Sequence, residues 1–278
     1  MIHNLYMRYP NGVAKALTFS YDDGVQQDRR LIAIFEKHGL KATFNLCSSL
    51  LTGEFGPRFL PAEEAKVLYD NPLVEVASHT VNHPSLPLGD SAMVYAEVVL
   101  DRKALEAMMG TRVHGMGYPF GTYNDAVVNI MRNSGIHYAR TVRSSYSFDL
   151  PDEWLVWHPT CHHNDPKLFD LADEFIALDP DKKHESHQEA KLFCVWGHSY
   201  EFDNNNNWDR IERFAEQMAG RDDIWYATNN EIYEYVRAFG RLRYSADGLL
   251  MQNPTAFDLW YEIGGKAAVI RSGETVKL

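Results

Sequence analysis

Between residues 16 and 24 the chain reads ALTFSYDDG. The apolar run Ala16–Ser20 predicts a buried strand, and two adjacent carboxylates, Asp22 and Asp23, follow where that strand ends. Neighbouring carboxylates repel each other unless a cation or a shared proton holds them together. Acidic pairs before a glycine also occur in plain turns, so this stretch alone leaves a turn and a functional site equally open.

Working outward from this stretch, short apolar runs alternate with longer amphipathic ones along most of the chain. The expected strands are Ala16–Ser20, Ala42–Leu46, Val74–Ser78, Val113–Tyr118, Tyr138–Val142, Lys191–Trp196 and Ile224–Ala227, with Trp154–Cys161 extended. The expected helices are Gln27–His38, Ala62–Tyr69, Ser91–Met109, Asp125–Ser134, Leu168–Leu178, Trp208–Met218 and Glu231–Phe239. This alternation predicts a parallel sheet with helices outside it, either a closed barrel or an open doubly wound sheet. Neither GxGxxG nor GxxxxGK[ST] is present, which disfavours the nucleotide-binding open sheets.

The pattern changes after Gly240 to alternating apolar and polar residues. Two such runs, Phe257–Ile263 and Ala267–Ile270, flank Gly264-Gly265, which is a hairpin signal. We therefore expect residues 241–278 to form a small β appendage on a barrel of residues 1–240. Its expected role is to cover the barrel rather than to act as an independent binding module.

Composition narrows the class of protein. The chain has 278 residues, 45% of them hydrophobic, and a formal charge of −11 from 38 acidic and 27 basic residues. This balance disfavours nucleic acid or an anionic membrane as the main partner, because both attract basic patches. Residues 1–10 show no signal peptide and no long uncharged stretch follows, so the expected location is the cytoplasm. The sequence does not predict an oligomeric state.

The three cysteines are far apart and form no CxxC pair. Neither a disulfide framework nor a thiolate zinc site is therefore expected. Cys47 and Cys194 lie in apolar runs and are interpreted as small buried hydrophobic residues.

A second group of polar residues, His79-Thr80-Val81-Asn82-His83, follows the strand Val74–Ser78. In a helical turn this spacing places both imidazoles on one face, as a metal ion requires, although a chance pair is not rare among twelve histidines. The zinc protease pattern needs Glu beside the first histidine, where Thr80 stands instead. Together with Asp23, the two histidines would form a three-ligand site with open positions, suited to Zn²⁺ or a similar divalent ion.

Two further motifs lie at predicted strand ends. One is Gly117-Tyr118-Pro119-Phe120-Gly121, and the other is Trp196-Gly197-His198-Ser199. Taken singly, the first reads as a turn and the second as a structural histidine. All four groups nevertheless fall at the C-terminal ends of parallel strands, where barrel enzymes place their active sites.

In combination, these motifs resemble the polysaccharide deacetylase family of carbohydrate esterases, which contains the NodB homology domain. That family has an Asp-Asp motif, a His-[Ser/Thr]-x-x-His motif, an Arg-x-Pro-[Tyr/Phe]-Gly motif and a late Leu-x-x-His motif, and the order matches from about residue 13 to 235. The resemblance implies an α/β fold, a distorted (β/α)7-type barrel. It also implies a metal-dependent hydrolase that removes N-acetyl groups from an amino-sugar-containing oligo- or polysaccharide, with an acetylated carbohydrate as its partner.

The resemblance also implies roles for individual residues. Asp22 would be the general base, His198 the general acid, and Asp23, His79 and His83 the ligands of one divalent metal ion, with Zn²⁺ favoured and Co²⁺ or Ni²⁺ as alternatives. The backbone N–H of Phe120 would stabilise the oxyanion, and Tyr118 and Trp157 would line the substrate site.

The chain departs from the family pattern at two points. Gly117 stands where the family has the arginine that orients the catalytic base, and we hypothesise that Arg140 or Arg143 reaches the site instead. The family's Asp-Trp motif, which tunes the acid histidine, is not matched cleanly; Asp152-Glu153-Trp154 is nearby. His158, His162 and His163 are interpreted as loop histidines, rather than as substrate-lining residues or a second metal site.

Other functions fit the same residues. The site could hydrolyse O-acetyl esters of glycans, or a C–N bond that is not on a sugar. A catalytically inactive carbohydrate-binding protein is a different class, but it is expected to have lost Asp22, a metal ligand or His198, and all are present. A non-haem iron oxygenase also uses two histidines and a carboxylate, but the alternating strand–helix pattern contradicts its usual β-sandwich.

Overall fold

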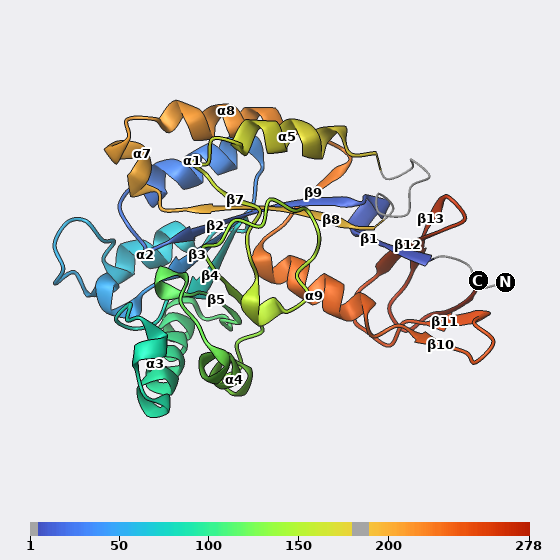
Figure 1. Ribbon diagram of the computed structural model, residues 1–278, viewed down its shortest axis with the longest axis horizontal. Helices are drawn as coiled ribbons and strands as arrows, with labels where there is room; N and C mark the ends of the chain where they lie inside the picture. The colour runs from blue at the N-terminus through green and yellow to red at the C-terminus, as the bar shows by residue number, and fades with distance from the viewer. Residues whose placement is uncertain (1–4, 180–188) are drawn as a thin grey trace.

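A curled parallel sheet forms the centre of the protein in the computed structural model, which describes residues 5–179 and 189–278. The sheet has eight strands in the order β6-β5-β4-β3-β2-β8-β7, with β9 paired to β2 (Figure 1). Their bounds are β2 Lys15–Asp22, β3 Ala42–Leu46, β4 Val74–Ser78, β5 Gly115–Gly117, β6 Tyr138–Arg140, β7 Cys161–His162, β8 Lys191–Gly197 and β9 Ile224–Tyr226. Every strand pair in this sheet is parallel, as the alternation of strands and helices predicted.

The two edges of the sheet are joined by one short segment. Trp157 forms a parallel bridge with Arg140 at the β6 edge, and β7 then pairs with β8. The stretch from Trp157 to His162 thus connects the edges, and the sheet curls into a distorted barrel. The predicted (β/α)7-type fold is confirmed.

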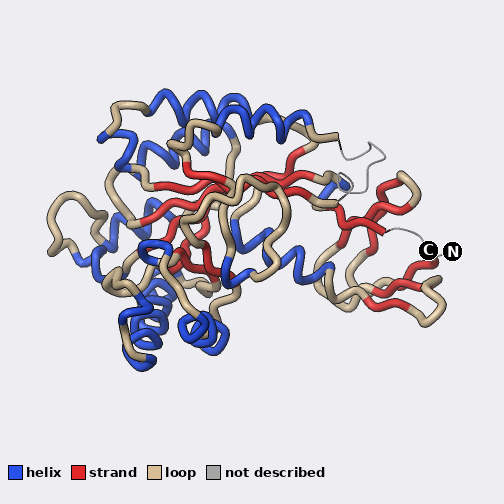
Figure 2. The backbone as a smooth tube through the Cα atoms, in the orientation of Figure 1, coloured by secondary structure: helices blue, strands red, loops and turns tan. Residues whose placement is uncertain are grey.

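Helices cover the sheet in two groups (Figures 1 and 2). On one side lie α1 Asp28–His38, α5 Leu168–Ala177, α7 Tyr200–Asn204 and α8 Trp208–Met218; on the other lie α2 Ala62–Tyr69, α3 Ser91–Met109 and α4 Asp125–Asn133. The last helix, α9 Asn229–Phe239, lies between the barrel and the C-terminal strands. Helix α3 has the predicted cap and stop: Asp90 accepts from the N–H of Met93, and Gly110 adopts φ 71°.

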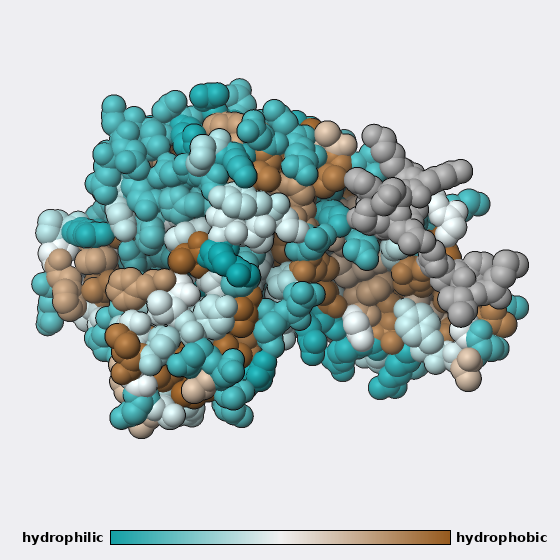
Figure 3. Space-filling model, in the orientation of Figure 1, coloured by the Kyte–Doolittle hydropathy of each residue, from teal (hydrophilic) through white to brown (hydrophobic). Residues whose placement is uncertain are grey.

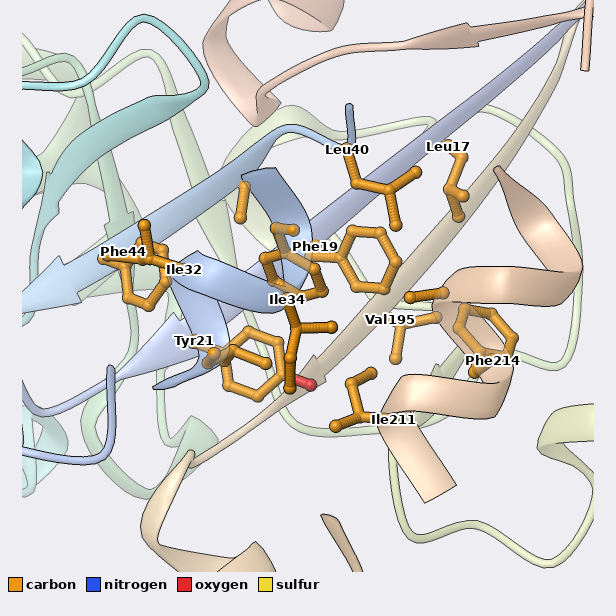
Figure 4. Packing of buried hydrophobic residues seen from close by; sticks show 14 of the residues in the cluster. Leu17, Phe19, Tyr21, Ile32, Ile34, Leu40, Phe44, Val195, Ile211 and Phe214 are labelled. Atoms are coloured by element: carbon orange, nitrogen blue, oxygen red, sulfur yellow. The ribbon is translucent and has the colours of Figure 1, made fainter. Parts of the chain in front are cut away.

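The central strand β2 separates an apolar layer from the barrel interior. Leu17, Phe19 and Tyr21 point to the helix side, where Phe19 packs against Phe35 of α1 and Phe214 of α8 at centroid distances of 4.5 and 6.0 Å (Figure 4). Because side chains alternate along a strand, Thr18, Ser20 and Asp22 point to the opposite face. All eight residues of β2 are buried, so these polar groups need partners inside the barrel.

The C-terminal strands form two three-stranded sheets, β1-β12-β13 and β10-β11-β14. Their bounds are β1 Leu5–Arg8, β10 Arg243–Tyr244, β11 Leu250–Gln252, β12 Leu259–Ile263, β13 Lys266–Ile270 and β14 Thr275–Lys277. Gly264 and Gly265 make the predicted turn between β12 and β13, with φ 59° and 77°. The pairing of β1 with β12 was not predicted, since the partners are remote in sequence. The boundary at residue 240 stays a prediction.

Several predicted elements are shorter than expected or differ in type. Strand β5 covers three residues and β6 another three, and Trp154–Val156 is a 3₁₀ helix rather than extended chain. Helix α9 begins two residues earlier than predicted, because Thr228 and Glu231 form a capping box. All three cysteines are buried and free, in agreement with the interpretation of Cys47 and Cys194.

The surface in Figure 3 is largely hydrophilic over α1, α5 and α8, while apolar residues gather near the C-terminal strands. Within the described ranges, no helix combines the length and hydrophobicity that crossing a bilayer requires. The expectation about a signal peptide concerns residues 1–10, of which 1–4 lie outside the described residues.

A buried ion pair between Arg8 of β1 and Glu262 of β12 holds the N-terminal strand in place, with side chains 2% and 7% exposed. We expect Glu262→Ala to lower the free energy of unfolding by about 3–5 kcal/mol, because it removes a buried carboxylate that forms an ion pair with a buried guanidinium. Urea unfolding followed by circular dichroism measures this. Glu212→Gln, which breaks an exposed pair with Arg30, is the control and should cost less than about 1 kcal/mol. Equal losses in the two variants would contradict the assignment.

Candidate active site

The predicted functional residues gather at one end of the barrel. Strands β2, β4, β5 and β8 end at Asp22, Ser78, Gly117 and Gly197, so the four sequence motifs emerge from the same edge of the sheet. This is the C-terminal edge, as expected for a barrel enzyme.

Asp23, His79 and His83 form a group with the geometry of a metal site. Their candidate ligand atoms all lie within 4.8 Å of one another, and Nε2 of His79 is 3.8 Å from Oδ1 of Asp23. That separation is too long for a hydrogen bond. Nδ1 of His79 lies 2.8 Å from the carbonyl oxygen of Gly117, so Nδ1 carries the proton and Nε2 offers its lone pair to the group. Two nitrogens and one carboxylate suit Zn²⁺ and related divalent ions.

The predicted helical turn at the two histidines is wrong. Residues 79–83 contain no helix, and Thr80 and His83 have φ of 67° and 54°. Hydrogen bonds to side chains replace the helical ones: the N–H of His83 donates to Oγ1 of Thr80, and the N–H of Asn82 donates to Glu97. The imidazoles still converge, because the left-handed residues fold the loop back on itself.

Backbone strain concentrates around this group. Of the seven non-glycine residues with positive φ in the described chain, four lie here: Asp23, Thr80, His83 and Phe120. Such conformations cost about 1–3 kcal/mol each and persist only where surrounding contacts fix them. For Asp23 one such contact is the hydrogen bond from its N–H to the carbonyl oxygen of Asn45 at 3.0 Å.

Asp22 is held as a carboxylate inside the barrel. Arg140, itself completely buried, forms an ion pair with Oδ1 of Asp22, and Asn45 donates to the same oxygen at 2.8 Å. Burial alone would raise the pKa of Asp22, but the charges of Arg140, His79 and His198 lower it to about 2. The other oxygen, Oδ2, lies 3.9 Å from Nε2 of His79 and 3.9 Å from Nε2 of His198.

The arginine hypothesis is confirmed for Arg140 and not for Arg143. Gly117 pairs in register with Arg140, and a Cβ on Gly117 would lie 2.7 Å from Nη2 of Arg140. The missing side chain at position 117 therefore leaves the space that the Arg140 guanidinium occupies. Arg143 is exposed and makes no ion pair within the described residues.

His198 is paired with a carboxylate that the sequence analysis missed. Glu201, on the short helix α7, places Oε1 at 3.2 Å from Nδ1 of His198. Burial lowers the pKa of His198, but Glu201, Asp22 and Asp23 outweigh burial and raise it. A raised pKa favours the protonated imidazole, as a proton donor requires. The only signal was the His198–Glu201 spacing of three residues, which brings side chains together only in a helical turn.

The other predicted residues divide into two groups. Phe120 is 62% exposed, and its ring packs edge-on against His83 at 4.5 Å, so it lies at the site. Tyr118 is completely buried and donates to the carbonyl oxygen of Leu155. Trp157 packs in the core against Tyr138. The side chains of Tyr118 and Trp157 therefore belong to the core, apart from the candidate ligand atoms.

A buried carboxyl group, that of Asp28, contacts the residue next to His198. Asp28 of α1 accepts hydrogen bonds from Ser199, the residue after His198, and from the hydroxyl of Tyr69 at 2.6 Å. Burial raises the pKa of Asp28 to about 7, although these two hydrogen bonds oppose the rise.

Comparison with known proteins agrees with this arrangement. Residues 8–139, which carry the Asp-Asp and His-x-x-x-His motifs and the Gly117–Gly121 motif, match the family model for polysaccharide deacetylases. The matched region, a little under half of the chain, is similar to that family and carries three of its four motifs. A search of curated protein sequences found no significant match.

Several solved structures superpose on this chain. A Mycobacterium smegmatis protein assigned to the polysaccharide deacetylases superposes with a TM-score of 0.61 at 17% identity, covering 84% of this chain and 94% of the other. A CE4 family pseudoenzyme from Bacillus anthracis gives a TM-score of 0.52 at 18% identity, covering 82% of this chain and 68% of the other. The chain spans 61% of the Streptococcus pyogenes deacetylase PplD, with a TM-score of 0.46 at 20% identity and 50% of this chain covered. At these identities the likeness establishes the fold alone.

The raised pKa of Asp28 has a consequence for stability. Between the unfolded value and about 7 the folded state holds a proton that the unfolded state has released, so stability falls as pH rises through this window. The Asp28→Asn variant cannot ionise at this position. Relative to that variant, we expect the free energy of unfolding of the unchanged chain to fall by about 3 kcal/mol between pH 4.5 and pH 8. Urea unfolding of both proteins across this range measures the difference. Parallel stability curves would show that Asp28 ionises normally in the folded protein.

Proposed function

We propose that this chain is a metal-dependent deacetylase that removes N-acetyl groups from an amino-sugar-containing oligo- or polysaccharide. The observation that carries the proposal is the position of Oδ2 of Asp22, which lies 3.9 Å from the candidate ligand His79 and 3.9 Å from His198. The proposed base, metal ligand and proton donor therefore lie within about 4 Å of one oxygen atom, and hydrolysis of an unactivated amide requires all three functions close together.

Asp23, His79 and His83 would hold the metal ion, for which we favour Zn²⁺ over Co²⁺ or Ni²⁺. When bound, such an ion supplies Lewis-acid chemistry, lowering the pKa of water and polarising a carbonyl group. The Nε2 lone pair of His79, fixed by the bond from its Nδ1 to Gly117, is ready for this role.

The residues of the chain divide the proton transfers between them. Asp22, kept ionised by Arg140, takes a proton from the attacking water through Oδ2. His198, which holds Glu201 through Nδ1, gives the proton on Nε2 to the departing nitrogen. The backbone N–H of Phe120, whose exposed ring packs against His83, would donate to the developing oxyanion.

The pairing of His198 with Glu201 favours an N-acetyl substrate over an O-acetyl ester. An amine is a poorer leaving group than an alcohol, so amide cleavage depends more on a proton donor. The pairing of His198 with Glu201 supplies that donor.

The pseudoenzyme among the structural relatives shows that the fold does not ensure activity. Here the base, the acid and all three candidate ligands are present, which supports an active enzyme.

Acetate release tests the proposal directly. N-acetylglucosamine oligomers, O-acetylated xylan and an aryl acetate are incubated with chelator-treated protein, before and after addition of Zn²⁺, Co²⁺ or Ni²⁺. We expect metal-dependent acetate from the N-acetyl oligomers, falling about 10²–10⁴-fold in Asp22→Asn, which lacks the base. Release from the esters alone would move the substrate to O-acetyl glycans. No release from any substrate, with metal bound, would contradict a deacetylase acting on these substrate classes.

Arg140 should matter for the reaction while Arg143 should not. Arg140→Met removes the ion pair that keeps Asp22 charged and oriented, and we expect kcat to fall about 10–100-fold with circular dichroism unchanged. Arg143→Met removes an exposed guanidinium from the same strand end and is the matched control. Similar losses in both variants would mean that the buried pair has no special role.

A further inference from the structure

Three histidines and one glutamate lie together beside the base. His162 and His163 stand at the end of β7, Glu201 is on α7, and His198 directly follows β8. Oε2 of Glu201 lies 3.0 Å from Nε2 of His162 and 2.9 Å from Nε2 of His163, while Oε1 faces His198. The two histidines on β7 were interpreted as loop residues, and nothing in the proposed chemistry uses them.

Local contacts fix where each of these imidazoles carries its proton. Nδ1 of His162 accepts the N–H of Asn164 at 3.1 Å, so the neutral ring has its proton on Nε2. Burial lowers the pKa of His163 to about 4, which makes this ring neutral at physiological pH. Its Nδ1 packs against Gly197 and has no acceptor among the described residues, whereas Nε2 lies 2.9 Å from Oε2 of Glu201, so this arrangement favours the proton on Nε2 here too. Both N–H groups therefore approach the same carboxylate oxygen.

The same two histidines and Glu201 also have the composition of a second metal site. A histidine that binds a metal through Nε2 needs its lone pair there and its proton on Nδ1. His162 has the opposite arrangement, since its Nδ1 is an acceptor. The geometry therefore fits a carboxylate contacted by imidazole N–H groups and not a cation.

Nε2 of His162 and Nε2 of His163 are both close to Oε2 of Glu201, but neither contact has the geometry of a good hydrogen bond. Packing nevertheless holds both rings in place. His163 packs against Phe202 and Tyr21, at centroid distances of 4.2 and 5.6 Å, and His162 packs edge-on against Trp196 at 4.6 Å. Two fixed N–H dipoles thus stabilise a glutamate whose own pKa is lowered by its three histidine neighbours against the effect of burial.

We propose that His162 and His163 are positioning residues that hold Oε2 of Glu201, so that Oε1 stays on Nδ1 of His198 and keeps this histidine a proton donor. Glutamate has three rotatable side-chain bonds, and without these contacts it can turn away from His198. The inference rests on the proposed function, in which His198 is the acid. Among the described residues, the charged and titratable groups that face His198 or Glu201 are Asp22 at the end of β2 and Asp23 directly after it, His83 of the metal group, Tyr21 of β2, Tyr200 of α7, His162 at the end of β7 and His163 directly after it.

His162 offers the cleaner test, since its side chain is 23% exposed and can be replaced without opening the core. His162→Leu removes the N–H donor, whereas His162→Gln keeps one of similar reach. Glu201→Gln gives the full effect of losing the carboxylate. The full-length chain, labelled with ¹⁵N-histidine and supplied with one equivalent of Zn²⁺, is titrated by NMR, and kcat and KM are measured against pH.

In His162→Leu we expect the titration midpoint of His198 to fall by about one pH unit, towards the value in Glu201→Gln. The alkaline limb of kcat should move by the same amount with KM unchanged, and His162→Gln should restore most of the shift. A midpoint that stays in place or rises would overturn the proposal. Direct coordination of a second equivalent of Zn²⁺ by His162 would overturn it as well.

The NMR readout separates this inference from the proposed function. If no acetylated substrate is turned over, the midpoint of His198 still shows whether His162 acts through Glu201. Thermal unfolding checks that each variant is folded, and His162→Ala, which also lacks an N–H donor, replaces His162→Leu if the latter is not. An equal midpoint in the folded variant and the unchanged chain counts against the proposal in either case.

Discussion

The ion pair between Arg140 and Asp22 is the constraint on which the rest of the site depends. Three strands lie between β6, which carries Arg140, and β2, which carries Asp22, yet the two side chains meet inside the barrel. This contact is possible only because the sheet curls until its opposite parts face each other. The guanidinium of Arg140 compensates the charge of Asp22, while Asp23 belongs to the candidate metal group with His79 and His83.

Around this pair the site is built from short loops in unusual conformations. The backbone is left-handed at Asp23, Thr80, His83 and Phe120, and these residues turn the loops sharply around the candidate metal group. Backbone N–H groups of these loops donate to Asn45, Thr80 and Glu97, so part of the support for the strained conformations comes from β3 and α3 outside the loops. The candidate ligand groups are therefore pre-arranged before any ion or substrate arrives.

The sequence predicts most of the framework because its signals there are local. The helix from Ser91 to Met109 has its cap and its glycine stop at the two residues that flank it. The motif at each strand end likewise marks the residues that we propose as base, acid and metal ligands. Where the outcome depends on tertiary contacts, the sequence does not decide. It limits the arginine to Arg140 or Arg143, but only burial distinguishes them. Glu201 escaped notice because three residues of spacing acquire meaning only once a helix starts at Tyr200.

The exchange of an arginine for a glycine at position 117 has an evolutionary consequence. Positions 117 and 140 share one small volume, since a Cβ at 117 would already lie 2.7 Å from the guanidinium of Arg140. An ancestor with arginine at both positions would be overfilled, and one with arginine at neither would leave Asp22 without its counter-charge. The residue types that positions 117 and 140 can hold are therefore linked, because a side chain at one competes for volume with the guanidinium at the other.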